Sequence, residues 1–110
     1  MRGRSDDVVR LYGAVEAFSK SLGPIELVTR DRYVLLRTVR IFADLVIMTD
    51  AVRVAIHLGR RVDDPLFFKV VSDKKKVTHV AKLQTIRDVE SVKPYLREAY
   101  ELSQIGRAHV

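Results

Sequence analysis

The residues with the most chemical potential lie in one short segment, HLGRRVDDP, at positions 57–65. Its imidazole, guanidinium groups and carboxylates could supply acid–base catalysis, a metal site or an anion-binding loop. Two adjacent aspartates alone provide too few oxygens for a calcium site, and no E-x-K or D-x-D pattern accompanies them as in a nuclease centre. An aspartate before a proline is a common start of a turn. The segment therefore favours a structural turn formed by Asp63, Asp64 and Pro65, in which Asp63 pairs with a neighbouring arginine.

The next candidates are His57 and His79. His57 falls on the polar side of an alternating strand, whereas His79 falls among apolar residues, so the two imidazoles point to opposite faces and cannot share a metal ion. A third metal ligand is also missing. We expect His79 to be a core histidine whose ring nitrogens are hydrogen-bonded, with help from Thr78 or Tyr33. The alternative is a pH-sensitive group in a shallow pocket that Tyr33 and His79 line.

Other catalytic patterns are weak. The five glycines never cluster into a phosphate-binding loop, which argues against nucleotide hydrolysis. No Ser-His-Asp order is convincing, although a triad is defined by geometry and not by sequence order. We therefore expect no catalytic residues, no metal ion and no cofactor. An enzyme ranks third among the functions considered, and convergence of His79, Asp64 and a basic residue in one cleft would favour it.

The elements that must position these residues are two helices around a group of strands. Asp6 and Asp7 follow a capping Ser5, and apolar residues then recur at helical spacing until Gly23-Pro24 ends the first helix. The second helix is expected to begin at Ser91, so that Pro94 lies in its first turn, where no N–H is needed. Dense branched and alternating residues predict the strands, which are 25–29, 33–38, 41–48, 52–58 and 77–83. The pattern predicts a single α+β domain, 5–103, built as a two-layer sandwich with an N-terminal and a C-terminal helix. Its sheet has about five mainly antiparallel strands.

Composition narrows the class of protein. The chain has 110 residues, 47% of them apolar, and no cysteine, which excludes disulfides and thiolate chemistry and is typical of the cytoplasm. No apolar run is long enough to span a bilayer, and the first residues, MRGRSDD, do not lead us to expect a signal peptide. The last residues, IGRAHV (105–110), match the translation of a sequencing-adapter read, ATC GGA AGA GCA CAC GTC. We therefore expect a non-native tail after a cut near Ser103.

Positive charge is concentrated in the middle of the chain. Between Arg30 and Lys82 there are twelve lysines and arginines against six acids, whereas the rest of the chain is balanced. Such clustering can mark an anionic partner, although a solvated basic surface has the same composition. Alternation places some of these cations on one side of the sheet.

Several spaced motifs resemble a family. The segments FADLVIMTDAVRVAIHLGRRVDDP (42–65), VTHVAKLQTIRDV (77–89) and YLREAY (95–100) resemble a small bacterial family known as a domain of unknown function. The resemblance covers about Val8 to Ser103 and implies a fold and a genomic neighbourhood, not an activity. Members stand alone or lie C-terminal to other domains, some nuclease-like, in proteins labelled predicted transport proteins. Many members have a basic residue after D-D-P where this chain has Leu66, which argues against an anion site there.

We expect a basic, accessory binding domain that contacts nucleic acid or another anionic partner through an exposed sheet face. The candidate contact residues are Arg37, Arg40, Arg53, His57, Arg60, Arg61 and Lys82. Aromatic residues for base stacking are sparse, with only Tyr33 and Phe42 available. The alternative is a protein-interaction or small-ligand domain that uses a pocket between sheet and helices, or the edge near Phe67 and Phe68. Its partner would be another protein or a fused domain.

Overall fold

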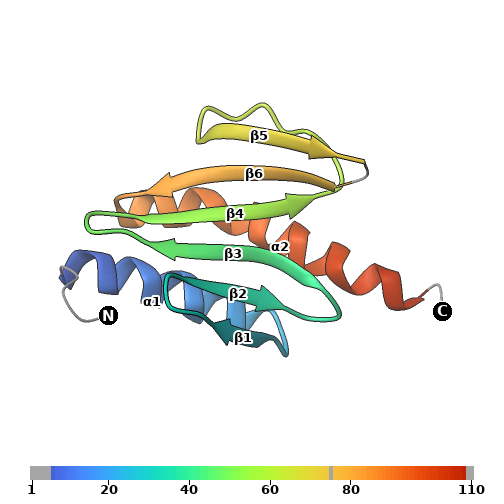
Figure 1. Ribbon diagram of the computed structural model, residues 1–110, viewed down its shortest axis with the longest axis horizontal. Coiled ribbons are helices and arrows are strands. Elements are labelled where there is room, and N and C mark those ends of the chain that lie inside the picture. The colour runs from blue at the N-terminus through green and yellow to red at the C-terminus, as the bar shows by residue number, and fades with distance from the viewer. Residues whose placement is uncertain (1–5, 75, 109–110) are drawn as a thin grey trace.

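The computed structural model describes residues 6–74 and 76–108, with side chains described as far as residue 104 (Figure 1). The predicted cap Ser5 lies outside the described residues, as do the side chains of the predicted tail. Within these described residues, two helices flank six strands. The elements are α1 (Asp6–Ser21), β1 (Glu26–Thr29), β2 (Tyr33–Arg37), β3 (Ile41–Ile47), β4 (Val52–Leu58), β5 (Phe67–Asp73), β6 (Lys76–Leu83) and α2 (Ile86–Ala108).

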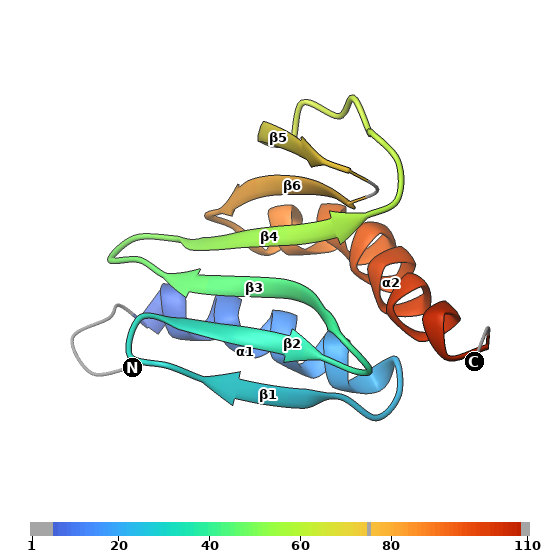
Figure 2. The same ribbon diagram turned by 45° about the vertical axis from the view of Figure 1, so that its right-hand side comes forward.

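All strands form one antiparallel sheet in the order β1-β2-β3-β4-β6-β5. Figures 1 and 2 show α1 and α2 side by side on the same face of this sheet, and no other helix or strand of the described residues covers the opposite face. The predicted α+β architecture with helices from both ends of the chain is confirmed, although the sheet has six strands and not five. We call the uncovered side the open face.

The core lies between the helices and the sheet because alternating strand residues point to that side. In β4, Val52, Val54, Ile56 and Leu58 are buried, whereas Arg53 is exposed. Helix α1 contributes an apolar stripe at helical spacing, and α2 contributes a second stripe. The helix residues that are buried in the core are Val8, Leu11, Val15, Val89, Val92, Leu96, Ala99 and Tyr100.

A close contact joins the end of α1 to α2. Gly23 has φ 150°, a conformation that L side chains rarely adopt. A Cβ atom at this position would lie 2.1 Å from the Tyr100 hydroxyl oxygen. Both backbone conformation and space therefore require glycine here. Tyr100 in turn packs edge-on against Phe42, with ring centroids 5.8 Å apart.

The predicted start of α2 at Ser91 was wrong. The helix begins at Ile86, because Thr85 and Asp88 form a capping box: Asp88 N–H donates to Thr85 Oγ1 at 3.2 Å, and Asp88 Oδ2 accepts from Thr85 N–H at 3.1 Å. Pro94 lies inside the helix, where it lacks the N–H that would bond to the Glu90 carbonyl. Burial of the apolar stripe on both sides of Pro94 offsets this loss.

Strand β5 was also not predicted. No strand was expected in residues 67–73. They form the edge strand next to β6, and a register shift between Phe67 and Lys69 interrupts their alternation. At the tip of the β5–β6 hairpin, Lys74 has φ 58°.

Candidate functional site

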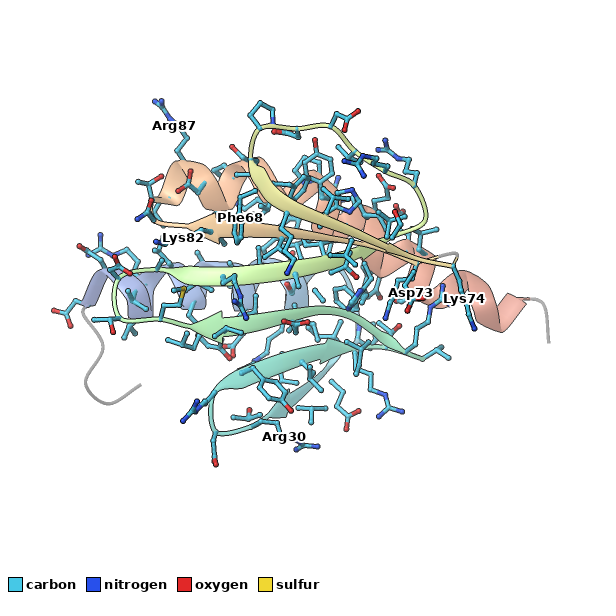
Figure 3. The ribbon with its side chains drawn as sticks, turned by 45° about the horizontal axis from the view of Figure 1, so that its top comes forward. Arg30, Phe68, Asp73, Lys74, Lys82 and Arg87 are labelled. Carbon is cyan, nitrogen blue, oxygen red and sulfur yellow. The ribbon has the colours of Figure 1, made fainter. Side chains whose placement is uncertain are left out.

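Strands β4 and β6 place basic side chains on the open face. Arg53 pairs in register with Lys82, and His57 pairs with Thr78. Because facing residues of neighbouring strands point to the same side, these four side chains share the open face. The sequence predicted this position for Arg53, His57 and Lys82. Figure 3 shows Lys82 on the side of the sheet away from the helices.

Arg53, Lys82 and Lys69 form a group of cations that we call the cation cluster. Lys69 pairs with Val80 of β6, which puts it diagonal to Lys82 on the same side of the sheet. None of the three makes an ion pair within 4.0 Å to a residue of the described part of the chain. Like charges directly opposite each other on a sheet are destabilising. The cluster is therefore an arrangement that an anionic partner would stabilise.

Two exposed aromatic rings lie at the ends of the same strip of the sheet. Tyr33 pairs with Val46 and Val46 with Arg53, so one row crosses the open face from Tyr33 to Lys82. Tyr33 is 40% exposed. At the other end, Phe68 occupies the bulge of β5 beside β6 and is 62% exposed, and Figure 3 shows it near Lys82. Exposed aromatic rings at these two positions offer faces on which planar groups can stack.

Asp44 is the carboxylate at the centre of the open face. It faces Leu35 on β2 and Ala55 on β4, and is half-buried. Burial raises the pKa of Asp44, while the positive charges of Arg53 and Lys76 act against this rise. The cations around Asp44 therefore help to keep it ionised.

The other predicted contact residues lie elsewhere. Arg37 is on the open face but forms an ion pair with Glu26 at 4.0 Å. Arg40 donates from Nη2 to the Leu102 carbonyl oxygen at 2.9 Å. Arg60 binds Glu98 of α2 through two hydrogen bonds, 2.9 and 3.1 Å long, and Arg61 pairs with Asp63 at 3.3 Å. Phe42 is buried in the core and not available for stacking.

The segment 57–65 contains a turn that hydrogen bonds and an ion pair hold against the core. Asp64 Oδ1 accepts from the Leu66 N–H at 2.9 Å, and Asp64 Oδ2 accepts from the Tyr95 hydroxyl at 2.7 Å. These two hydrogen bonds, the backbone one foremost, lower the pKa of Asp64. With Asp63 paired to Arg61, both carboxylates are occupied by structural contacts.

His79 holds this turn from inside. It is fully buried, and its Nε2 accepts from the Val62 N–H at 2.9 Å while Nδ1 lies 3.2 Å from the Val77 carbonyl oxygen. A neutral ring that carries its proton on Nδ1 satisfies both bonds. Burial lowers the pKa of His79, which favours this neutral form. The partners are backbone groups and not Thr78 or Tyr33; Tyr33 lies on the open face, so the two expected pocket residues are not together.

His57 has a different environment. Its Nδ1 lies 3.2 Å from Thr78 Oγ1 on the open face. Burial, followed by the nearby charge of Lys76, lowers the pKa of His57 to about 4. The ring is therefore neutral at pH 7 and can act as a hydrogen-bond donor or acceptor.

Sequence reasoning missed Lys69, Phe68 and Asp44 as members of the open face. Lys69 and Phe68 belong to the strand that was not predicted. Asp44 could have been found, because its place in β3 alternates with the apolar residues Ala43 and Leu45. No group of three or more His, Cys, Asp or Glu residues that could hold a metal ion occurs within the described ranges. No helix in the described part is long and apolar enough to cross a membrane.

Comparison with protein families gives one match. The model of the domain of unknown function DUF5655 matches residues 1–103. The chain belongs to the DUF5655 family. This agrees with the resemblance to a small domain of unknown function that the sequence motifs indicated. The comparisons with curated proteins and with solved structures found no match. Membership of DUF5655 assigns no activity, so any function must be argued from the surface of the domain.

Proposed function

We propose that the open face binds single-stranded nucleic acid. The observation that carries this proposal is the row that joins Tyr33, the cation cluster and Phe68 across the sheet. Proteins that bind single strands without a base code combine a basic surface for phosphates with aromatic rings on which bases stack. This row supplies both kinds of contact.

The dimensions suit such a ligand. Strands β2 and β5 are four strand spacings apart in the sheet, which is about 19 Å at about 4.8 Å per spacing. An extended strand of a few nucleotides can cross this distance with bases at both rings and phosphates over the cations. A duplex keeps its bases stacked inside and offers no ring faces to Tyr33 or Phe68. The arrangement therefore favours single strands over duplexes.

The first experiment is a fluorescence anisotropy titration of the full chain with a labelled single strand of about 12 nucleotides. Three phosphate contacts predict that the logarithm of the association constant falls with the logarithm of salt concentration with a slope of about −2. Replacing Arg53, Lys69 and Lys82 together by glutamine should abolish most of this slope. Each single replacement should reduce it by about 0.7.

The matched control removes three exposed cations from the helix layer, by changing Arg10, Lys20 and Arg97 to glutamine. This variant has the same net charge as the triple variant of the cation cluster. It should keep nearly all of the affinity, because its changes lie on the covered side of the sheet. Equal losses in the two triple variants would show that net charge, and not the open face, attracts the oligonucleotide.

Two further changes test the geometry in opposite directions. Phe68→Ala should weaken binding by about 1–3 kcal/mol, which is the contribution of one stacked base. Phe68→Leu keeps the apolar bulk but not the ring, and so separates stacking on the ring from general apolar contact. Asp44→Asn removes the one central negative charge and should strengthen binding. Unchanged or weaker binding in Asp44→Asn, or a duplex that binds as tightly as the single strand, would contradict the proposal.

A further inference from the structure

A pocket lies at the end of the sheet where β3 and β4 meet the later turns of α2. Its volume is about 250 Å³. The floor is apolar and consists of Phe42, Leu58, Ala99 and Leu102. Tyr33 and His79 do not line it, so it differs from the shallow pocket considered from the sequence. It is also separate from the cation cluster, since Arg53 lies at the beginning of β4 and this pocket at its end.

The rim of this pocket is basic. Arg40, His57 and Lys76 line it, and no acidic side chain of the described residues does. The Arg40 guanidinium is held in place by its hydrogen bond to the Leu102 carbonyl oxygen, which uses one of its five N–H donors. The remaining donors and the Lys76 ammonium, which forms no ion pair within 4.0 Å in the described part, are available to a ligand.

Hydrogen bonds within the domain hold the walls of the pocket. The hydroxyl groups of Thr38 and Ser103 are 2.5 Å apart, which ties the β2–β3 turn carrying Arg40 to α2. On the other wall, Thr78 holds His57 through Nδ1 at 3.2 Å, so the second ring nitrogen is left for a ligand. A pocket with fixed walls loses little freedom on binding, which favours affinity for small molecules.

We infer that this pocket binds a small organic anion, with a carboxylate at the rim between Arg40, His57 and Lys76 and an apolar body over the floor. An arginine can bind a carboxylate through paired N–H donors. Burial of a ligand's hydrocarbon part against the apolar floor stabilises the complex. The volume is just below the range of about 300–1,000 Å³ that is usual for drug-sized ligands. The ligand class is therefore an aryl or short-chain carboxylate.

The test is an NMR titration of the ¹⁵N-labelled full chain with sodium benzoate, with benzamide as the neutral analogue and inorganic phosphate as an anion without an apolar body. Benzoate should give saturable shifts at Ile41, Phe42, Leu58, Gly59 and Ala99, with a dissociation constant on the order of 1 mM. Benzamide should bind at least about tenfold more weakly, because it lacks the charge that the rim recognises. Phosphate should leave the floor residues unshifted.

Variants separate this pocket from the rest of the surface. Lys76→Gln should weaken benzoate binding several-fold, whereas Lys69→Gln, a lysine of the cation cluster away from the pocket, should not change it. Gly59→Val places a side chain toward the pocket: a Cβ there meets Leu102 Cδ1 at an ordinary 3.8 Å, so the fold should persist while binding is lost. The thermal midpoint of each variant confirms that it folds.

Three outcomes would overturn the inference: no saturable shift with benzoate, equal shifts with benzoate and phosphate, or equal losses in Lys76→Gln and Lys69→Gln. None of them bears on single-strand binding, which depends on the cation cluster of Arg53, Lys69 and Lys82 and on the two aromatic rings. The two proposals can therefore fail separately.

Discussion

Replacing His79 with leucine should destabilise the domain by about 2 kcal/mol. The leucine removes the acceptor of the Val62 N–H and the donor to the Val77 carbonyl. A buried N–H that loses its partner costs about 1–3 kcal/mol, and the lower end applies because Val62 is only partly buried. The lost bond to Val77 adds about 1 kcal/mol. His79→Gln should cost about half as much, since its amide oxygen can replace Nε2 as the acceptor.

The pH dependence of this effect has a definite sign. The pKa of His79 is lower in the folded state than the value of about 6.5 for an unfolded histidine. The unfolded state therefore binds more protons below this value, and the free energy of unfolding falls as the pH drops from about 6.5 toward the folded pKa. The variant His79→Leu has no imidazole at this position and therefore lacks this pH-dependent loss of unfolding free energy. The gap in stability between the wild type and His79→Leu should narrow in acid.

Urea denaturation followed by far-UV circular dichroism, from pH 8 to 5, measures both quantities. The midpoint of thermal unfolding provides a check, because about 2 kcal/mol corresponds to a decrease of about 8 °C or more in a domain of this size. The reasoning fails if His79→Leu is as stable as the wild type, or if the gap stays constant or widens in acid. The first result would mean that the two ring hydrogen bonds do not stabilise the turn, and the second that burial does not lower the pKa of His79.

Three other changes test the backbone of the fold. Lys74→Gly should stabilise the domain by about 0.5 kcal/mol, because φ 58° is unfavourable for lysine and free for glycine; a lower thermal midpoint would contradict this. Thr85→Ala should destabilise it by about 1 kcal/mol through loss of the cap, whereas Ser91→Ala should have little effect in the same urea titration. Pro94→Ala should raise the stability by about 1–3 kcal/mol, since it restores a helical hydrogen bond; calorimetry that shows no gain would indicate that the helix is already relaxed around the proline.

Sequence reasoning succeeded where one physical signal dominated. Strand β4 alternates without interruption, so the opposite orientations of Arg53 and Ile56 followed from the period of two. The same period placed His57 and His79 on opposite faces, which the register confirms. Helix α1 ends as predicted before Gly23, where the backbone conformation excludes other residues.

Sequence reasoning failed where two signals in the same segment pointed to different structures. Pro94 was given more weight than the capping box at Thr85, although packing of the helix stripe outweighs one missing hydrogen bond. Strand β5 has a bulge at its start and exposed residues on both faces, so Phe67 and Lys69 show no period that could reveal it. The pocket lined by Arg40, His57 and Lys76 depends on contacts such as that of Thr38 with Ser103, and local sequence carries no information about pairs so distant in the chain.

The packing of α2 on the sheet, which also brings Tyr100 against Gly23, has a consequence for the assembly of the domain. Strands β1 to β4 connect through short turns and can pair as soon as they leave the ribosome. Their apolar side, however, is covered in part by α2, whose residues are synthesised after those of all the strands. During translation, apolar side chains of the nascent sheet are therefore exposed to water until α2 has been synthesised. A chaperone or a fused neighbouring domain would be of most use in this interval.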